Sequence, residues 1–218
     1  MKADEQEKQR RLSPAEQRRL ERFQEISAGL IEQGYRQTEL TVGIVRANIF
    51  ALLLAVPVLA LGLILFWLKN ADSLRFSMRS GFSGAGWLIF LAAVLALTVV
   101  HELIHGLTWA RFAEHGWQDI EFGFMKEYLT PYCTCGVPLT RGQYILGGLM
   151  PLIVLGLIPT VVAICCGSLL LLGIGLVMIL GAGGDILIVL RMLGFRGAGR
   201  EALYYDHPTR AGVVVFEK

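Results

Sequence analysis

The stretch His101-Glu102-Leu103-Ile104-His105 has the residue types and the spacing of a metal-dependent hydrolytic site. On a helix, side chains four positions apart share a face and lie about 5–6 Å from each other, so both imidazoles can bind one metal ion. Glu102 follows the first histidine, where its carboxylate can reach a water molecule beside the metal without binding the metal itself. We therefore predict that His101 and His105 bind Zn²⁺ and that Glu102 is the catalytic base.

The surroundings of this motif favour a functional interpretation. It lies within an apolar run, residues 86–112, that is long enough to cross a membrane. Ionisable side chains in such a helix are costly to bury, and they usually mark functional sites. The alternative is a packed pair of polar side chains on this helix, with Glu102 as a bystander.

The composition predicts an integral membrane protein. Hydrophobic residues make up 54% of the 218 residues and charged residues only 17%, whereas a soluble domain carries about 25% charged residues. Four apolar stretches reach the roughly 20 residues that a hydrocarbon core requires. They are residues 44–68, 86–112, 143–166 and 168–193.

These stretches set the expected fold class. Prolines at 57, 151 and 159 predict kinks, which bundled membrane helices tolerate. Little more than Gly167 separates the last two stretches, so they should form a tight antiparallel hairpin. We expect a predominantly α-helical integral membrane protein with about four transmembrane helices and a small cytosolic β-hairpin element.

The distribution of basic residues predicts the orientation. An even number of spans places both termini on one side of the membrane. Lys and Arg are dense in residues 1–46 and recur in the tail at Arg191, Arg196, Arg200 and Arg210, so both termini should be cytosolic in a plasma (inner) membrane. The four cysteines, in the pairs Cys133/Cys135 and Cys165/Cys166, suggest no disulfide framework.

The segments outside the membrane divide the chain into three parts. Ser13-Pro14-Ala15-Glu16 is a capping box, so residues 1–34 should contain a charged cytosolic helix that rests on the membrane or on the rest of the protein. Residues 35–200 form the four-span membrane domain, with a strand at about 35–42 and cytosolic strands at 118–140. Residues 201–218 form a cytosolic tail with another strand pair.

A catalytic zinc ion takes three protein ligands, and the best third candidate is Asp185. It is the only acidic residue of the stretch 168–193 and follows Gly181-Ala182-Gly183-Gly184. Counting at about 1.5 Å per residue from the outer surface places it at the same depth as the two histidines. The small residues before it should let its helix approach the histidine helix closely.

Other metal-binding candidates fit less well. The acidic residues that follow the motif helix lie beyond its predicted end, where solvation is expected; they are Glu114, Asp119, Glu121 and Glu127. His115 and His207 have no recognised metal spacing and are expected at the surface. Cys133 and Cys135 share one face of a strand, where a packing or turn role is expected rather than metal binding.

Several segments of the sequence resemble those of a known family. The residues that carry the resemblance are His-Glu-Leu-Ile-His-Gly in a membrane helix, Tyr-Cys-Thr-Cys-Gly-Val-Pro-Leu in the strands, a helix with Pro151, and Gly-Gly-Asp185. Together they resemble the bacterial zincin peptidases formerly catalogued as a domain of unknown function, and more distantly the site-2 intramembrane zinc proteases. The resemblance runs from about residue 35 to the tail. It implies zinc bound by His101, His105 and Asp185, with Glu102 as the base.

The resemblance and the residues together predict a zinc-dependent metalloendopeptidase that cleaves membrane or membrane-associated proteins near the cytosolic face. Its expected partners are a membrane protein or peptide substrate and the lipid bilayer, with no nucleic acid, and the oligomeric state stays open. The alternative is a non-catalytic metal-binding scaffold or pseudoprotease in the membrane. Against that alternative, a site that only binds metal has no use for Glu102 beside it.

Overall fold

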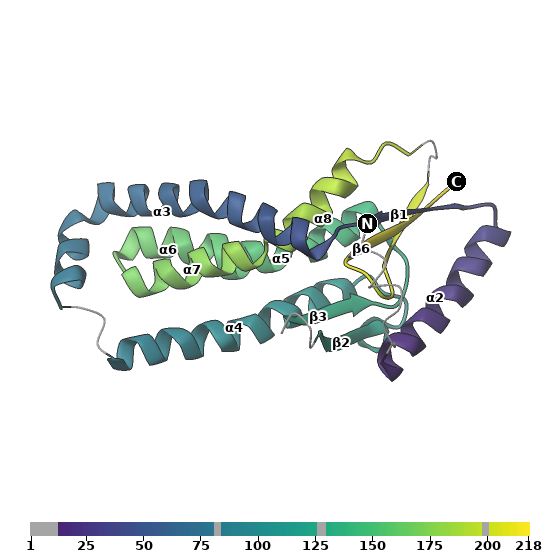
Figure 1. The fold of residues 1–218 in the computed structure, drawn as a ribbon, viewed down its shortest axis with the longest axis horizontal. Helices are drawn as coiled ribbons and strands as arrows, with labels where there is room; N and C mark the ends of the chain where they lie inside the picture. The colour runs from purple at the N-terminus through teal and green to yellow at the C-terminus, as the bar shows by residue number, and fades with distance from the viewer. Residues whose placement is uncertain (1–12, 81–83, 126–129, 198–200) are drawn as a thin grey trace.

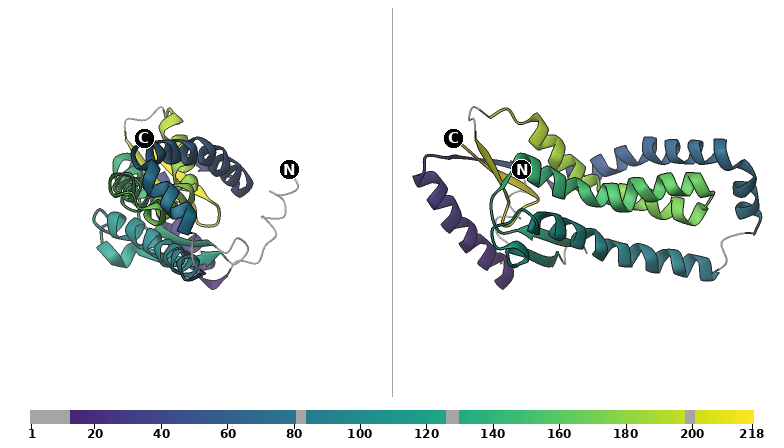
Figure 2. Two further views of the ribbon diagram at one scale, coloured as in Figure 1. Left: turned by 90° about the vertical axis from the view of Figure 1, so that its left-hand side faces the viewer. Right: turned by 180° about the vertical axis from the view of Figure 1, so that it is seen from behind.

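A computed structural model describes residues 13–80, 84–125, 130–197 and 201–218 of the chain. Long helices run side by side along the molecule, and the strands gather at one end of them (Figures 1 and 2). The helical elements are α2 (Pro14–Glu32), α3 (Ile44–Ser80), α4 (Gly84–Ala110), η1 (Gly116–Asp119), α5 (Arg141–Pro151), the π-helical turn η2 (Leu152–Leu157), α6 (Ile158–Cys166), α7 (Leu169–Gly181) and α8 (Gly183–Gly194). The strands are β1 (Arg36–Thr41), β2 (Ile120–Met125), β3 (Thr130–Cys135), β4 (Leu139–Thr140), β5 (Ala202–Asp206) and β6 (Gly212–Glu217).

Three helical segments of the described chain are long and apolar enough to cross a membrane, namely Val45–Ala71, Gly86–Ala110 and Arg141–Cys166. A fourth crossing is possible if α7 and α8 count as one span bent by 44°. The chain is therefore a multi-pass membrane protein, and the predicted fold class is confirmed. Most apolar side chains along α3 and α4 are exposed, as expected for helices that face lipid.

The fourth predicted span is broken rather than straight. Ala182, with φ of −75° and ψ of 3°, separates α7 from α8. At the other end of α7, the predicted tight turn is confirmed, because Gly167 ends α6 in the left-handed conformation with φ of 73°. The break at Ala182 places Asp185 in the first turn of a new helix instead of the middle of a long one.

The expected proline kinks take a different form. α3 continues through Pro57, and its non-helical backbone lies at Asn70 instead. The Asn70 side chain donates a hydrogen bond of 2.8 Å to the carbonyl of Ile164 on α6, which ties the two helices together. At Pro151 the helix continues as the π-helical turn η2, because proline has no N–H to donate to the preceding turn.

The strands form two antiparallel sheets. β2 pairs with β3 from Ile120↔Cys135 to Met125↔Thr130, which confirms the predicted strand pair between the second and third spans. The predicted pair in the tail, β5 and β6, is also present, but it belongs to a four-stranded sheet in the order β1-β6-β5-β4. This sheet joins the segment before α3 to the end of the chain, and its β6 side chains from Val213 to Phe216 are fully buried.

Helix α2 covers this sheet. The predicted capping box is present: the Ser13 hydroxyl accepts from the Glu16 N–H at 3.3 Å, and the Glu16 carboxylate accepts from the Ser13 N–H at 2.8 Å. The apolar face of α2 packs against a buried cluster on the sheet through Phe23, Ile26 and Leu30. Of the two supports expected for this helix, the structure places it on the rest of the protein. The basic residues before position 13 lie outside the described residues.

Candidate metal centre

Two helices bring the three predicted ligands together. α4 presents His101 and His105 on one face, and both side chains are buried. Asp185 reaches them from the first turn of α8. Its Oδ2 lies 3.2 Å from Nε2 of His101 and 3.5 Å from Nε2 of His105. Among the residues that the structure describes, His101, His105 and Asp185 form the group of side chains close enough together to hold a metal ion.

The geometry of this group fits a zinc ion. Ligand atoms at about 2.0–2.1 Å from a tetrahedral zinc ion lie about 3.3 Å from one another. The two distances to the Asp185 oxygen are close to that value, and all three ligand atoms lie within 4.8 Å of one another. Two imidazoles and one carboxylate are a common ligand set of catalytic zinc sites, which keep the fourth position for water or substrate.

The backbone of α5 sets the tautomer of His105. Nδ1 of His105 lies 2.9 Å from the carbonyl oxygen of Gly147. A carbonyl can only accept, so Nδ1 carries the hydrogen and the lone pair of Nε2 points to Asp185. Such a contact to the second ring nitrogen is typical of metal-binding histidines, and it orients the ring as well.

Close packing of α4 and α5 makes this contact possible. A Cβ atom at Gly147 would lie 2.0 Å from Nε1 of Trp109, so only glycine fits there. Trp109 stacks on His105 with 5.1 Å between ring centroids and an interplanar angle of 15°. Its Nε1 donates to the carbonyl of Tyr144 at 3.3 Å. Trp109 and Gly147 were not among the predicted site residues, although Trp109 continues the four-residue spacing of the two histidines.

The small residues before Asp185 serve a different contact from the expected one. A Cβ at Gly183 would lie 2.6 Å from Cβ of Ala51, so this glycine admits α3 rather than α4. Gly181 and Gly184 have no neighbours that a Cβ would meet. The close approach of helices was therefore predicted correctly as a feature of this segment, but with the wrong partner. The break at Ala182 is what directs Asp185 toward the histidines.

Glu102 lies where α4 meets the β2–β3 pair. Its carboxylate faces the main-chain N–H of Cys133 on β3. The strands approach this closely because position 106 is glycine. A Cβ there would lie 2.7 Å from Cζ of Phe122 and 2.9 Å from Cγ2 of Ile120. Gly106, the last residue of the His-Glu-Leu-Ile-His-Gly segment, thus lets the β2–β3 pair pack against α4 beside Glu102, the predicted base.

A second carboxylate, Asp206 of β5, binds the other end of this strand. It accepts from the N–H of Cys135 at 2.7 Å, and its other oxygen accepts from the Tyr144 hydroxyl. Burial raises the pKa of Asp206 to about 6, although both hydrogen bonds favour its charged form. Asp206 was not among the predicted site residues, because nothing in the sequence of the tail connects it to α5.

The remaining candidates lie apart from the three ligands. Glu114 is exposed and His115 largely so, as expected. Two expectations were wrong: the Asp119 side chain is 2% exposed, because it is paired with Arg22 of α2, and His207 is buried, because its Nδ1 accepts the N–H groups of the turn that follows it. Glu127 lies outside the described residues.

The cysteines are free. Cys133 and Cys135 are both buried on one face of β3, as the strand spacing predicted, whereas Cys165 and Cys166 are exposed.

Comparisons with known proteins agree with this centre. No curated protein and no solved structure matches the chain. A family described as "Putative zincin peptidase" matches residues 94–196, a little under half of the chain. The match contains the motif of α4, the β2–β3 pair, the Gly147 backbone and Asp185. Over this region, the chain is similar to that family of zincin peptidases.

Proposed function

We propose that this protein is an integral-membrane, zinc-dependent metalloendopeptidase that hydrolyses peptide bonds of membrane or membrane-associated proteins near the cytosolic face. The observation that carries the proposal is the meeting of His101, His105 and Asp185 beside Glu102. The similarity of residues 94–196 to the zincin peptidase family supports the same chemistry.

Each residue of the centre has one role in this mechanism. His101, His105 and Asp185 would hold the ion, and the Gly147 carbonyl would keep His105 in the binding tautomer. When bound, zinc supplies a Lewis acid that polarises a carbonyl group and makes water a better nucleophile at neutral pH. Glu102 takes a proton from the attacking water as the water oxygen bonds to the carbonyl carbon of the peptide. Glu102 then gives that proton to the amide nitrogen as the C–N bond breaks.

An extended substrate is required, because a helical peptide bond is shielded by its own hydrogen bonds. We propose that the β2–β3 pair captures an unwound segment by strand addition. The pair lies against α4 next to Glu102, and its aromatic side chains Phe122 and Phe124 are 44% and 54% exposed. If proline substitutions within Ile120–Phe124 left cleavage unchanged in a correctly inserted protein, this part of the proposal would be wrong.

The proposed location is a plasma (inner) membrane with both termini cytosolic. Both described ends of the chain lie at the strand-bearing end of the molecule (Figure 1), which suits an even number of crossings. The basic tail residues support the cytosolic assignment of this end. The ligands lie near this end of α4, so cleavage is expected near the cytosolic face.

The experiment pairs metal analysis with cleavage. Wild type, His101→Ala and Glu102→Gln proteins are purified in detergent, and their zinc content is measured. Each is then incubated with a panel of reporter proteins that carry one apolar span. We expect wild type to bind one zinc and cleave a reporter, His101→Ala to lose zinc, and Glu102→Gln to keep zinc without cleavage. Zinc binding with equal cleavage by Glu102→Gln would contradict the mechanism, and absence of zinc from wild type would favour a non-catalytic scaffold.

A further inference from the structure

Helix α2 lies outside the part of the chain that matches the family, yet it contacts both sheets. Its apolar face packs on the four-stranded sheet, where the Phe23 ring lies 5.4 Å from that of Tyr205 and 6.3 Å from that of Phe216. Its basic face carries Arg19 and Arg22 toward the β2–β3 pair. The helix therefore bridges two sheets that are not hydrogen-bonded into one.

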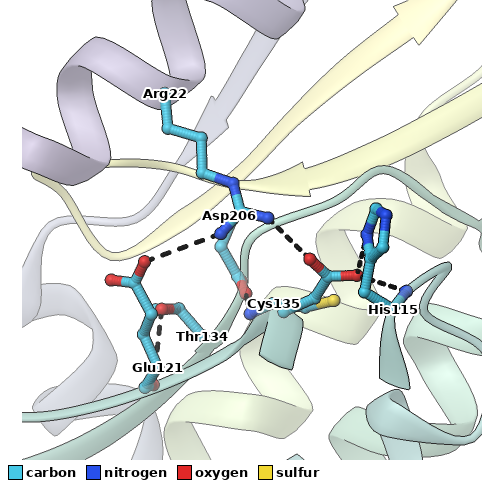
Figure 3. A network of polar contacts seen from close by, with 7 residues as sticks. Arg22, His115, Glu121, Thr134, Cys135 and Asp206 are labelled. Carbon is cyan, nitrogen blue, oxygen red and sulfur yellow. Dashed lines mark hydrogen bonds and ion pairs between the residues drawn. The ribbon is translucent and has the colours of Figure 1, made fainter. Parts of the chain in front are cut away.

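Arg22 makes the principal contact with the β2–β3 side. Its Nη2 lies 2.6 Å from Oδ1 of Asp119, directly before β2. Its Nη1 lies 3.8 Å from Oε1 of Glu121 on β2 (Figure 3). The Asp119 side chain is 2% exposed, and it also accepts from the N–H of His115 at 2.8 Å. A carboxylate this buried is costly to leave without its cation, so loss of Arg22 should destabilise the protein more than loss of an ordinary surface ion pair.

Two neighbouring contacts strengthen the attachment. The Arg19 guanidinium lies over the ring of Tyr132 on β3, 4.6 Å from its centroid. The Arg22 guanidinium also packs on Gly136, just after β3, where a Cβ would lie 2.6 Å from Nη1. α2 thus contacts both strands of the pair and the turn that follows them.

The position of the β2–β3 pair affects the surroundings of Glu102. Ile120, Phe122 and Cys133 contact the surface of α4 at Gly106, one helical turn from Glu102, and the N–H of Cys133 faces the Glu102 carboxylate. The metal ligands lie on α4 and α8, and their described polar contacts are with one another and with α5 rather than with these strands. A shift of the strands would therefore disturb the base and leave the ligands in place.

We infer that α2 clamps the β2–β3 pair onto α4, and that Arg22 is a positioning residue that acts on Glu102 through Asp119 and β3. The clamp itself stands on contacts alone, whereas its effect on cleavage rests on the proposed function. This assigns a role to the N-terminal helix, which the family resemblance does not cover.

The buried thiols of β3 report whether the strands stay docked. In full-length protein with Cys165→Ala and Cys166→Ala, only Cys133 and Cys135 remain to react with N-ethylmaleimide. Both are buried, and burial raises the pKa of the Cys135 thiol to about 12, so reaction in the docked state is slow. We expect Arg22→Ala to speed alkylation on the order of tenfold, because the strands open more often. Arg18→Ala, an exposed arginine on the same helix, is the matched control and should react like wild type.

Two further readouts separate positioning from general unfolding. Zinc content of Arg22→Ala should equal that of wild type, while turnover of a cleaved reporter falls with little change in KM. Arg22→Lys keeps the charge and should restore slow alkylation and most of the turnover. Alkylation of Arg22→Ala at the rate of Arg18→Ala would overturn the clamp, and so would loss of zinc together with faster alkylation. If wild type binds no zinc, the proposed function fails, but the alkylation result still decides the clamp.

Discussion

The helices that carry the metal ligands and the layer of strands beside them hold their functional groups by different means. Among the helices, glycine lets backbones approach: Gly147 brings its carbonyl to His105, and Gly183 admits α3 beside Asp185. In the strand layer, charged groups make the connections: Arg22 binds Asp119, and Asp206 binds the backbone of β3. The ligand geometry should therefore respond to side-chain volume, and the placement of Glu102 to charge.

This difference separates metal binding from catalysis. Glu102→Gln removes the base but keeps the shape of the side chain. We expect cleavage to fall by about 10²–10⁴-fold, the usual contribution of a general base. Zinc content measured on the same sample should be unchanged. A fall in zinc equal to the fall in cleavage would place Glu102 among the ligands and remove the distinction between the two regions.

The role of helix packing in metal binding is tested most directly at Gly147. Gly147→Ala puts a methyl group into the Trp109 ring and moves the carbonyl away from His105. We expect zinc affinity to fall by about 10–100-fold, as when the outer partner of a metal-binding histidine is lost. Gly142→Ala on the same helix is the control, because a Cβ there meets no atom within 4 Å. Competition with a zinc chelator gives both affinities, and equal values would show that α5 does not support the centre.

The strand layer should carry the pH dependence of stability. The pKa of Asp206 is raised to about 6, above its ordinary value of 3.8, so the native state binds this proton more tightly than the unfolded state. Its contribution to stability is fully present below about pH 4 and is lost as the pH rises through about 6, by on the order of 3 kcal/mol. Thermal unfolding in detergent, followed by tryptophan fluorescence at a series of pH values, measures this change in stability. Asp206→Asn should remove this loss of stability between about pH 4 and 6, and the exposed-site variant Glu32→Gln should keep it.

Exposure should set the size of each charged contact. Arg210 also binds a carboxylate, with 2.8 Å from its Nη2 to Oε2 of Glu39, but both side chains are 41% exposed. We expect Arg210→Ala to change the free energy of unfolding by less than about 1 kcal/mol, the usual range for surface pairs. A larger loss than that caused by Arg22→Ala, in the same thermal unfolding assay, would refute the idea that burial of the Asp119 side chain makes the clamp strong.

Much of the helical framework could be predicted from the sequence, because local signals dominate there. Apolar length predicted the crossings, Gly167 the tight turn, and the capping box the start of α2. The meeting of Asp185 with the histidines could also be predicted, since helices with a fixed rise per residue allow depths to be counted. What counting could not predict was the break at Ala182, which depends on how α8 packs against α3.

The strand layer was harder to predict because its contacts join distant parts of the chain. The four-stranded sheet pairs residues near 36 with residues near 217, and Asp119 was expected in solvent because its partner lies 97 positions earlier. Asp206 and Tyr144 are 62 positions apart and meet only because the tail folds back over α5. Pairings of this kind have no local pattern, so only the folded chain reveals them.

The central claim is that Asp185 completes the metal centre, and zinc stoichiometry of Asp185→Ala tests it most directly. The matched control is Glu114→Ala, which removes an exposed carboxylate that follows the motif helix at the spacing of an alternative ligand. We predict that purified wild type and Glu114→Ala each bind one zinc per chain, and that Asp185→Ala binds almost none under the same dialysis. Zinc retained by Asp185→Ala and lost from Glu114→Ala would contradict the centre described here.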